Sequence, residues 1–176
     1  MNCIKTITDE DFGLKSVKLN NPRTRKGARG IVKRNDGKIA LLFKSNMNEY
    51  KLPGGGIDEN EDPKDAFKRE VLEETGCVVT IEKELGTIIE NKTLDNFTQT
   101  SYLYVGRVTE DKKRLNLTKR EKEEGAQLIW VIPNKALELI KKSMNNIQES
   151  KYENVYHSRF IILRDQTILE YYLKEE

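Results

Sequence analysis

Residues 55–77 read GGIDENEDPKDAFKREVLEETGC, and this stretch decides both the fold and the chemistry of the chain. Asp62 and Pro63 indicate a helix start, because aspartate accepts hydrogen bonds from the first helical N–H groups and proline suits the first helical position. Gly76 is typical of the left-handed residue that ends a helix. The stretch therefore predicts a helix from Pro63 to Thr75.

Carboxylates are concentrated on this helix and just before it. Residues 57–74 contain eight acidic and three basic side chains, although the whole chain carries a net charge of only +2. At ~100° per residue, Glu70, Glu73 and Glu74 share one arc of about 100°. The helix side beside that arc is apolar and is predicted to face the core: Ala66, Phe67 and Val71.

Like charges at this spacing destabilise a helix, so a compensating cation is expected. Oxygen ligands favour a hard divalent ion, Mg²⁺ or Mn²⁺. The alternative interpretation is a solvated acidic face. The neighbouring residues favour the metal: Gly54, Gly55 and Gly56 predict an irregular loop that lets backbone N–H groups approach an anion. Arg69 is placed to hold a glutamate in one rotamer.

The pattern Gly55-x5-Glu61-x7-Arg69-Glu70-Val71-x-Glu73-Glu74-x-Gly76-Cys77 resembles the Nudix box, G-x5-E-x7-R-E-U-x-E-E-x-G-U, where U is a bulky aliphatic residue. Every fixed position matches, and the one departure is Cys77 at the last U position. The resemblance implies an α/β fold of the Nudix type. This fold is an α/β/α sandwich with a mixed β-sheet, in which the box, residues 55–77, forms a loop-helix-loop.

The resemblance also implies hydrolysis of a nucleoside diphosphate linked to another moiety, X. Glu70, Glu73 and Glu74 would be metal ligands, and Arg69 would orient a carboxylate. Glu61 would support these ligands or assist as one. The general base would be Glu70 or a glutamate outside the box.

An acidic segment precedes Trp130 and is similar to an acidic loop downstream of the box in many Nudix proteins. It contains Glu121, Glu123 and Glu124, and we take Glu124 as the candidate that reaches the metal. The alternative is a charged loop that faces solvent.

Patterns elsewhere in the chain predict further elements. Asp36-Gly37 is a hairpin signal between two β-runs. Apolar residues at helical spacing predict a helix that opens at Pro133 and another over residues 152–173. The remaining expectations are an N-terminal arm over 1–28, strands at 29–34, 38–43, 50–52, 77–81, 85–90, 97–108 and 127–132, and a charged loop over 111–125.

Several side chains outside the box have both a structural and a functional interpretation. The basic stretch from Arg23 to Arg34 is either a solvated surface or a source of phosphate and base contacts, with Arg29 the leading candidate. Trp130 is expected in the core, and His157 is expected to be an ordinary residue of the last helix. Packing is also favoured over nucleobase stacking for two tyrosines, Tyr102 and Tyr104.

Composition excludes several classes of function. A net charge of +2 supplies no overall field for binding nucleic acid or anionic lipid. The single histidine and two cysteines rule out a His-rich zinc site and a disulfide framework. Short apolar runs predict no membrane span and no signal peptide. We therefore expect a cytoplasmic protein whose residues 1–176 form one domain and whose partner is a small nucleotide, and we leave a homodimer open.

The sequence says less about the substrate. Among Nudix proteins, ADP-ribose subgroups are often marked by a proline downstream of the box, and dinucleoside polyphosphate subgroups tend to carry a tyrosine there. This chain has no proline between Pro63 and Pro133 and no tyrosine between Cys77 and Tyr102, so the resemblance disfavours both subgroups. What remains is a nucleoside triphosphate pyrophosphohydrolase of MutT type, with oxidised guanine nucleotides among its candidate substrates. The alternatives are an ADP-ribose or other nucleotide-sugar pyrophosphatase and a non-catalytic nucleotide-sensing module.

Overall fold

Eight strands form one mixed β-sheet in the computed structural model, which describes residues 1–176. The strand order is β1-β6-β7-β2-β3-β4, with β5 added to β2 and β8 added to β3. The β1–β6 and β2–β7 pairs are parallel and the other pairs are antiparallel. The strands are β1 (Cys3–Ile7), β2 (Arg23–Lys33), β3 (Ile39–Lys44), β4 (Glu49–Lys51), β5 (Gly54–Gly56), β6 (Cys77–Lys92), β7 (Phe97–Asp111) and β8 (Ala126–Val131).

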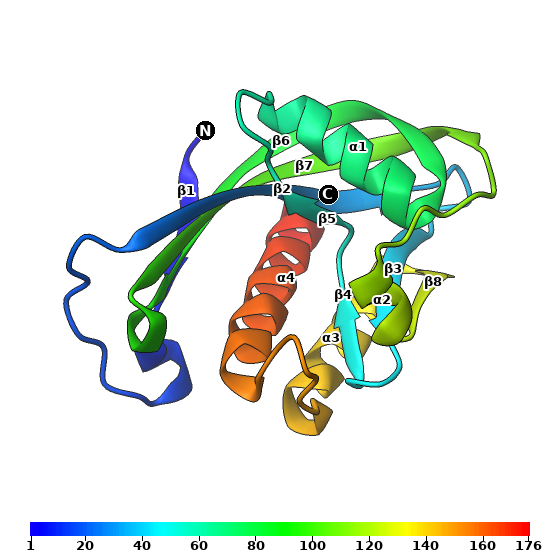
Figure 1. The fold of residues 1–176 in the computed structure, drawn as a ribbon. Helices are drawn as coiled ribbons and strands as arrows, with labels where there is room; N and C mark the ends of the chain where they lie inside the picture. Colours follow the sequence, from blue (N-terminus) through cyan, green and yellow to red (C-terminus); the bar gives the residue numbers. More distant parts are fainter.

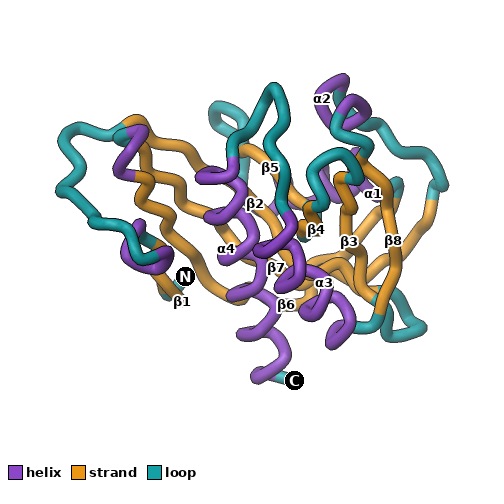
Figure 2. The backbone as a smooth tube through the Cα atoms, turned by 90° about the horizontal axis from the view of Figure 1, so that it is seen from below, coloured by secondary structure: helices purple, strands orange, loops and turns teal.

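Helices cover both faces of this sheet. Helix α1 (Pro63–Thr75) lies on one face, whereas α3 (Pro133–Asn146) and α4 (Val155–Glu175) lie together on the other (Figures 1 and 2). The remaining helices are short: η1 (Asp9–Phe12), η2 (Thr93–Asp95) and α2 (Lys119–Glu123). This arrangement confirms the predicted α/β/α sandwich with a mixed sheet.

Two hydrophobic cores form because successive strand residues point to opposite faces. On β2, Ala28 and Val32 belong to the core beneath α1, together with Phe67 and Val71 of that helix. Ile31 belongs to the larger core beneath α3 and α4. The predicted apolar side of α1 is thereby confirmed, and Tyr104 packs against Phe67 in the same core.

The termini and the long strands differ in detail from the expectations. The segment 1–28 is not a plain arm, because residues 3–7 pair in parallel with β6 and β2 already begins at Arg23. The strands expected at 77–81 and 85–90 are one strand, β6, which continues through three irregularities in its pairing with β7. The last helix starts at Val155 because the side chain of Asn154 accepts a hydrogen bond from the N–H of His157.

The predicted hairpin is present, with Lys33 of β2 opposite Ile39 of β3. The segment expected as a loop over 111–125 contains α2, which the sequence pattern Thr118-x-x-Glu121 initiates as a capping box. No helix combines the length and the apolar character needed to cross a bilayer.

Candidate active site

Helix α1 begins and ends where its sequence predicts. Asp62 accepts a hydrogen bond from the N–H of Lys64 at 2.8 Å, and Gly76 adopts φ 71° at the other end. Because Phe67 and Val71 are buried against the sheet, the residues beside them are held at the border of the core. Glu70 and Glu74 therefore face the edge of the sheet at strand β5.

The three glycines do not form the irregular loop that was expected. Gly54, Gly55 and Gly56 are strand β5, which pairs antiparallel with residues 27–29 of β2. A Cβ atom on Gly55 would lie 2.3 Å from Oε2 of Glu70. Glycine is required here because the backbone passes directly against this carboxylate, so pairing with β2 overrides the weak strand preference of glycine.

Glu74 is the most buried carboxylate of the box, with a side chain only 3% exposed. It accepts hydrogen bonds from the N–H of Gly54 at 2.7 Å and from Nζ of Lys51 at 2.8 Å. Burial raises the pKa of Glu74 to about 7, although Lys51 and the Gly54 N–H both oppose this shift. A buried carboxylate with a raised pKa at a cavity edge is typical of a functional site.

Arg69 connects the carboxylates before the helix with those on it. It donates to both oxygens of Glu61 at 2.8 Å, to Glu70 at 2.8 Å and to the carbonyl of Gly56 at 3.0 Å. The hydrogen bonds from Arg69 lower the pKa of Glu61 to about 2. The contact with Glu70 is the one expected from sequence, in which Arg69 holds a glutamate in one rotamer.

Glu73 is the most exposed of the three helix glutamates, with 37% of its side chain accessible. Partial burial and then the charge of Glu70 raise its pKa. No three Asp, Glu, His or Cys side chains lie close enough together to coordinate one ion. The carboxylate of Glu70 is turned to Arg69, and that of Glu74 is turned to Lys51.

The acidic segment before β8 divides between two environments. Glu124 is 2% exposed and pairs with Arg120 at 3.0 Å and with Lys44 at 3.1 Å. Glu121, on the first turn of α2, lies near enough to Glu74 for each carboxylate to affect the pKa of the other. Sequence reasoning preferred Glu124, whereas the structure brings Glu121 to the box. The capping box at Thr118 was the sequence signal that could have placed Glu121 on a helix.

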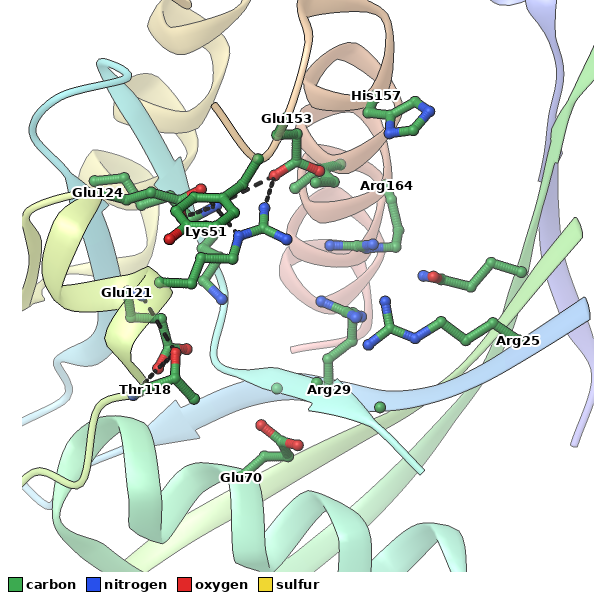
Figure 3. Close-up of a pocket in the computed structure, with 18 of the residues that line it drawn as sticks. Arg25, Arg29, Lys51, Glu70, Thr118, Glu121, Glu124, Glu153, His157 and Arg164 are labelled. Atoms are coloured by element: carbon green, nitrogen blue, oxygen red, sulfur yellow. Dashed lines mark hydrogen bonds and ion pairs between the residues drawn. The ribbon is translucent and has the colours of Figure 1, made fainter. Parts of the chain in front are cut away.

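These groups line a cavity of about 550 Å³. Glu70, Glu74 and Glu121 contribute to one side, and Figure 3 shows Arg29 on another. His157 also lines the cavity and contacts Asp95 at 2.5 Å, so it is not the ordinary helix residue that was expected. Trp130 does not line the cavity; it is half-buried, and Arg34 lies over its ring.

Comparison with known proteins identifies the family. The NUDIX domain model matches residues 23–154, which is most of the chain, and this chain therefore belongs to the NUDIX family. The family consists of hydrolases that act on phosphorus anhydrides and generally use divalent metal ions.

Individual relatives agree with this assignment. The chain is 30% identical over 109 residues to a "Putative 8-oxo-dGTP diphosphatase" of Bacillus subtilis, covering 62% of this chain and 67% of that protein. It is 36% identical over 64 residues to a "MutT-like protein" of Streptomyces ambofaciens, covering 36% of this chain and 41% of that one.

Solved structures show the same fold. A NUDIX hydrolase from Nitrosomonas europaea superimposes with a TM-score of 0.62 at 16% identity, covering 87% of this chain and 90% of the other. A MutT protein from Methanosarcina mazei gives a TM-score of 0.54 at 20% identity, covering 89% and 99%.

Proposed function

We propose that this chain is a divalent-metal-dependent pyrophosphohydrolase that acts on nucleoside triphosphates in the manner of MutT proteins. The observation that carries the proposal is the meeting of Glu70 and Glu74 of α1 with Glu121 of α2 at one cavity edge. The similarity to the Bacillus protein named for 8-oxo-dGTP supports oxidised guanine nucleotides as candidate substrates.

The residues at this edge fit Mg²⁺ or Mn²⁺. Every available side-chain donor of Glu70, Glu73, Glu74 and Glu121 is a carboxylate oxygen, the ligand type that hard cations prefer. Arg69 pairs with Glu70 and Lys51 pairs with Glu74, so positive charge already lies beside both carboxylates. We assign Glu70, Glu74 and Glu121, which line the cavity, and Glu73 beside them on α1 as the residues that would hold the ion; their side chains would have to turn toward it, because they do not surround one point in the structure.

A bound divalent ion would neutralise the pyrophosphate and lower the pKa of a water molecule. The chain's own groups complete the chemistry. Glu70 or Glu121 accepts the proton from the attacking water, and Arg69 keeps Glu70 oriented for this role. Lys51 lines the cavity and supplies positive charge to a phosphate oxygen. Strand β5 keeps its backbone close to the substrate because its glycines carry no side chains.

Steady-state hydrolysis of a substrate panel tests this function. The panel contains dGTP, 8-oxo-dGTP and ADP-ribose, each assayed with Mg²⁺ and with EDTA. We expect metal-dependent release of pyrophosphate from the two triphosphates and a lower kcat/KM for ADP-ribose. A preference for ADP-ribose would contradict the MutT assignment. Binding of nucleotides without turnover of any substrate would indicate a sensing module instead.

A further inference from the structure

The wall of the cavity opposite the box glutamates is strongly basic. The wall is formed by strands β2 and β6 and helix α4. The titratable side chains that these elements place in the cavity lining are five cations and one histidine: Arg23, Arg25, Arg29, Lys92, Arg164 and His157. Two acidic lining residues lie near them: Asp95 of η2, which contacts His157, and Glu153, which pairs with Arg120 and acts on the charge of Lys92. The apolar lining of the whole cavity is small and consists of Phe97, Tyr152 and Ile161. This wall suits an anion better than a flat apolar group.

Arg29 has no partner within the protein. Its side chain is buried, its Nε makes no hydrogen bond, and no carboxylate lies within ion-pair distance. Burial and then the charge of Arg164 lower the pKa of Arg29 to about 10. A buried guanidinium without a direct ion pair is costly for a fold, because the charges of Asp165, Glu90 and Glu74 act on it only from beyond ion-pair distance and offset only part of its lost hydration. Such a group at a cavity wall indicates an anionic ligand.

Arg164 and Arg25 complete the same wall. Arg164 is 1% exposed and pairs with Asp165 at 2.8 Å and with Glu90 at 3.2 Å, but its Nη2 is buried without a partner. Arg25 is exposed, and a Cβ atom on Gly56 would lie 2.9 Å from its Nη2. Figure 3 shows the guanidinium groups of Arg25, Arg29 and Arg164 pointing into one part of the cavity.

This wall lies on a different face of the sheet from Glu70. Gly55 meets Glu70, which comes from α1, whereas its neighbour Gly56 meets Arg25. Ala28 belongs to the hydrophobic core beneath α1, so its neighbour Arg29 points to the opposite face of β2. Arg29 shares that face with Ile31, which belongs to the core beneath α3 and α4. The arginines therefore line the same cavity as the glutamates, but from another side than Glu70.

We propose that Arg25, Arg29 and Arg164 bind a phosphate group of the substrate that is additional to the pyrophosphate being cleaved. The inference rests on the proposed function and narrows its substrate class to nucleoside 5′-polyphosphates that carry a further phosphate on the sugar. Guanidinium groups match phosphate by donating paired hydrogen bonds. A buried donor discriminates most strongly between a substrate that carries this phosphate and one that lacks it.

Phosphate binding in the absence of metal tests the proposed arginine site independently of catalysis. Thermal unfolding and calorimetry are measured with inorganic phosphate in EDTA. We expect phosphate to stabilise the wild-type protein and Glu73→Gln, and to bind Arg29→Met and Arg25→Gln about tenfold more weakly or worse. Arg34→Gln is the matched control, because Arg34 follows the same strand but lies outside the cavity. Wild-type protein that gains no stability from phosphate would contradict the proposal.

The fold of the buried variant is checked in the same measurement. Without phosphate, Arg29→Met should unfold at the wild-type temperature or above it, because methionine removes an unpaired buried charge and keeps most of the volume. If Arg29→Met fails to fold, the test relies on Arg25→Gln, whose side chain is exposed. Phosphate binding by Arg25→Gln that equals wild-type binding would then contradict the proposed phosphate site.

Rates on a matched pair of substrates test the substrate class. The pair is GTP and guanosine 5′-triphosphate 3′-phosphate, both with Mg²⁺. We expect wild type to favour the second by about tenfold or more in kcat/KM, and this ratio to fall toward one in Arg25→Gln and Arg29→Met but not in Arg34→Gln. Equal kcat/KM values in wild type would overturn the inference. Failure to hydrolyse either substrate would defeat the proposed function, and the phosphate-binding result would then decide the inference.

Discussion

The carboxylate of Glu74 accepts a hydrogen bond from the backbone N–H of Gly54 at 2.7 Å. This bond joins helix α1 to strand β5, so the residue that is a candidate metal ligand also holds the glycine strand in place. Glu74 therefore differs from Glu73, which is more exposed and makes no such connection. Substitution of Glu74 should therefore affect stability, whereas substitution of Glu73 should not.

Glu73→Gln should reduce metal-dependent turnover by about 100-fold or more and leave the fold unchanged, since its side chain is partly exposed and its ion pair is with Arg69 at 3.6 Å. Kinetics with Mg²⁺ and thermal unfolding measure the two effects. Glu138→Gln is the control, because Glu138 lies on the surface of α3 and pairs only with Lys135. Near-normal turnover by Glu73→Gln would show that this residue is no metal ligand.

Glu74→Gln should lose both activity and stability. An amide carries no negative charge, and its NH2 group would face either the Lys51 ammonium or the Gly54 N–H, so we expect destabilisation of about 1–3 kcal/mol in urea unfolding. An isostable Glu74→Gln variant would mean that the link to Lys51 contributes nothing to folding.

Gly55→Ala should reduce activity about 100-fold at a cost of less than about 1 kcal/mol in stability. The added Cβ displaces only the flexible end of Glu70, 2.3 Å away, and not the backbone. Gly37→Ala should show the reverse pattern. Gly37 adopts φ 79° in an open turn, so its alanine variant should lose about 1 kcal/mol and keep full activity. Full activity of Gly55→Ala would indicate that β5 is only a connection.

Glu61→Gln should be less stable than wild type by ~1 kcal/mol at pH 7, and the difference should vanish in acid. The hydrogen bonds from Arg69 lower the pKa of Glu61 from its ordinary 4.5 to about 2. The unfolded chain then binds the proton more readily than the folded one, so this stabilisation is present above about pH 4.5 and is lost as the pH falls toward 2. Urea unfolding across this range, with the exposed Glu59→Gln as control, measures it. A difference independent of pH would exclude the ion pair as its source.

EDTA should abolish hydrolysis, and Mg²⁺ or Mn²⁺ should restore it. Nucleoside triphosphates should yield the monophosphate and pyrophosphate, whereas nucleoside monophosphates should stay intact because they lack two adjacent phosphates. Reaction in ¹⁸O-labelled water shows which phosphorus is attacked. Turnover in EDTA, or phosphate release from a monophosphate, would contradict the proposed mechanism.

The sequence by itself determined helix α1 and the family. The ends of α1 depend on contacts within a few residues, such as the hydrogen bond that the N–H of Lys64 donates to Asp62, and its buried side follows from helical periodicity. The fixed positions of the box could therefore be read directly, and the predicted sandwich was confirmed.

Tertiary structure decided what depends on distant segments. Gly54–Gly56 became a strand because β2 supplies hydrogen-bond partners that no local pattern reveals. Glu121, and not Glu124, came to lie beside Glu74 because Lys44 and Arg120 hold Glu124 elsewhere. Arg29 and Arg164 are far apart in the sequence, and only the packing of α4 on the sheet brings their guanidinium groups to one cavity. Local hydrogen bonding and periodicity can be read from one stretch of sequence, whereas burial and charge pairing between distant residues exist only once the chain has folded.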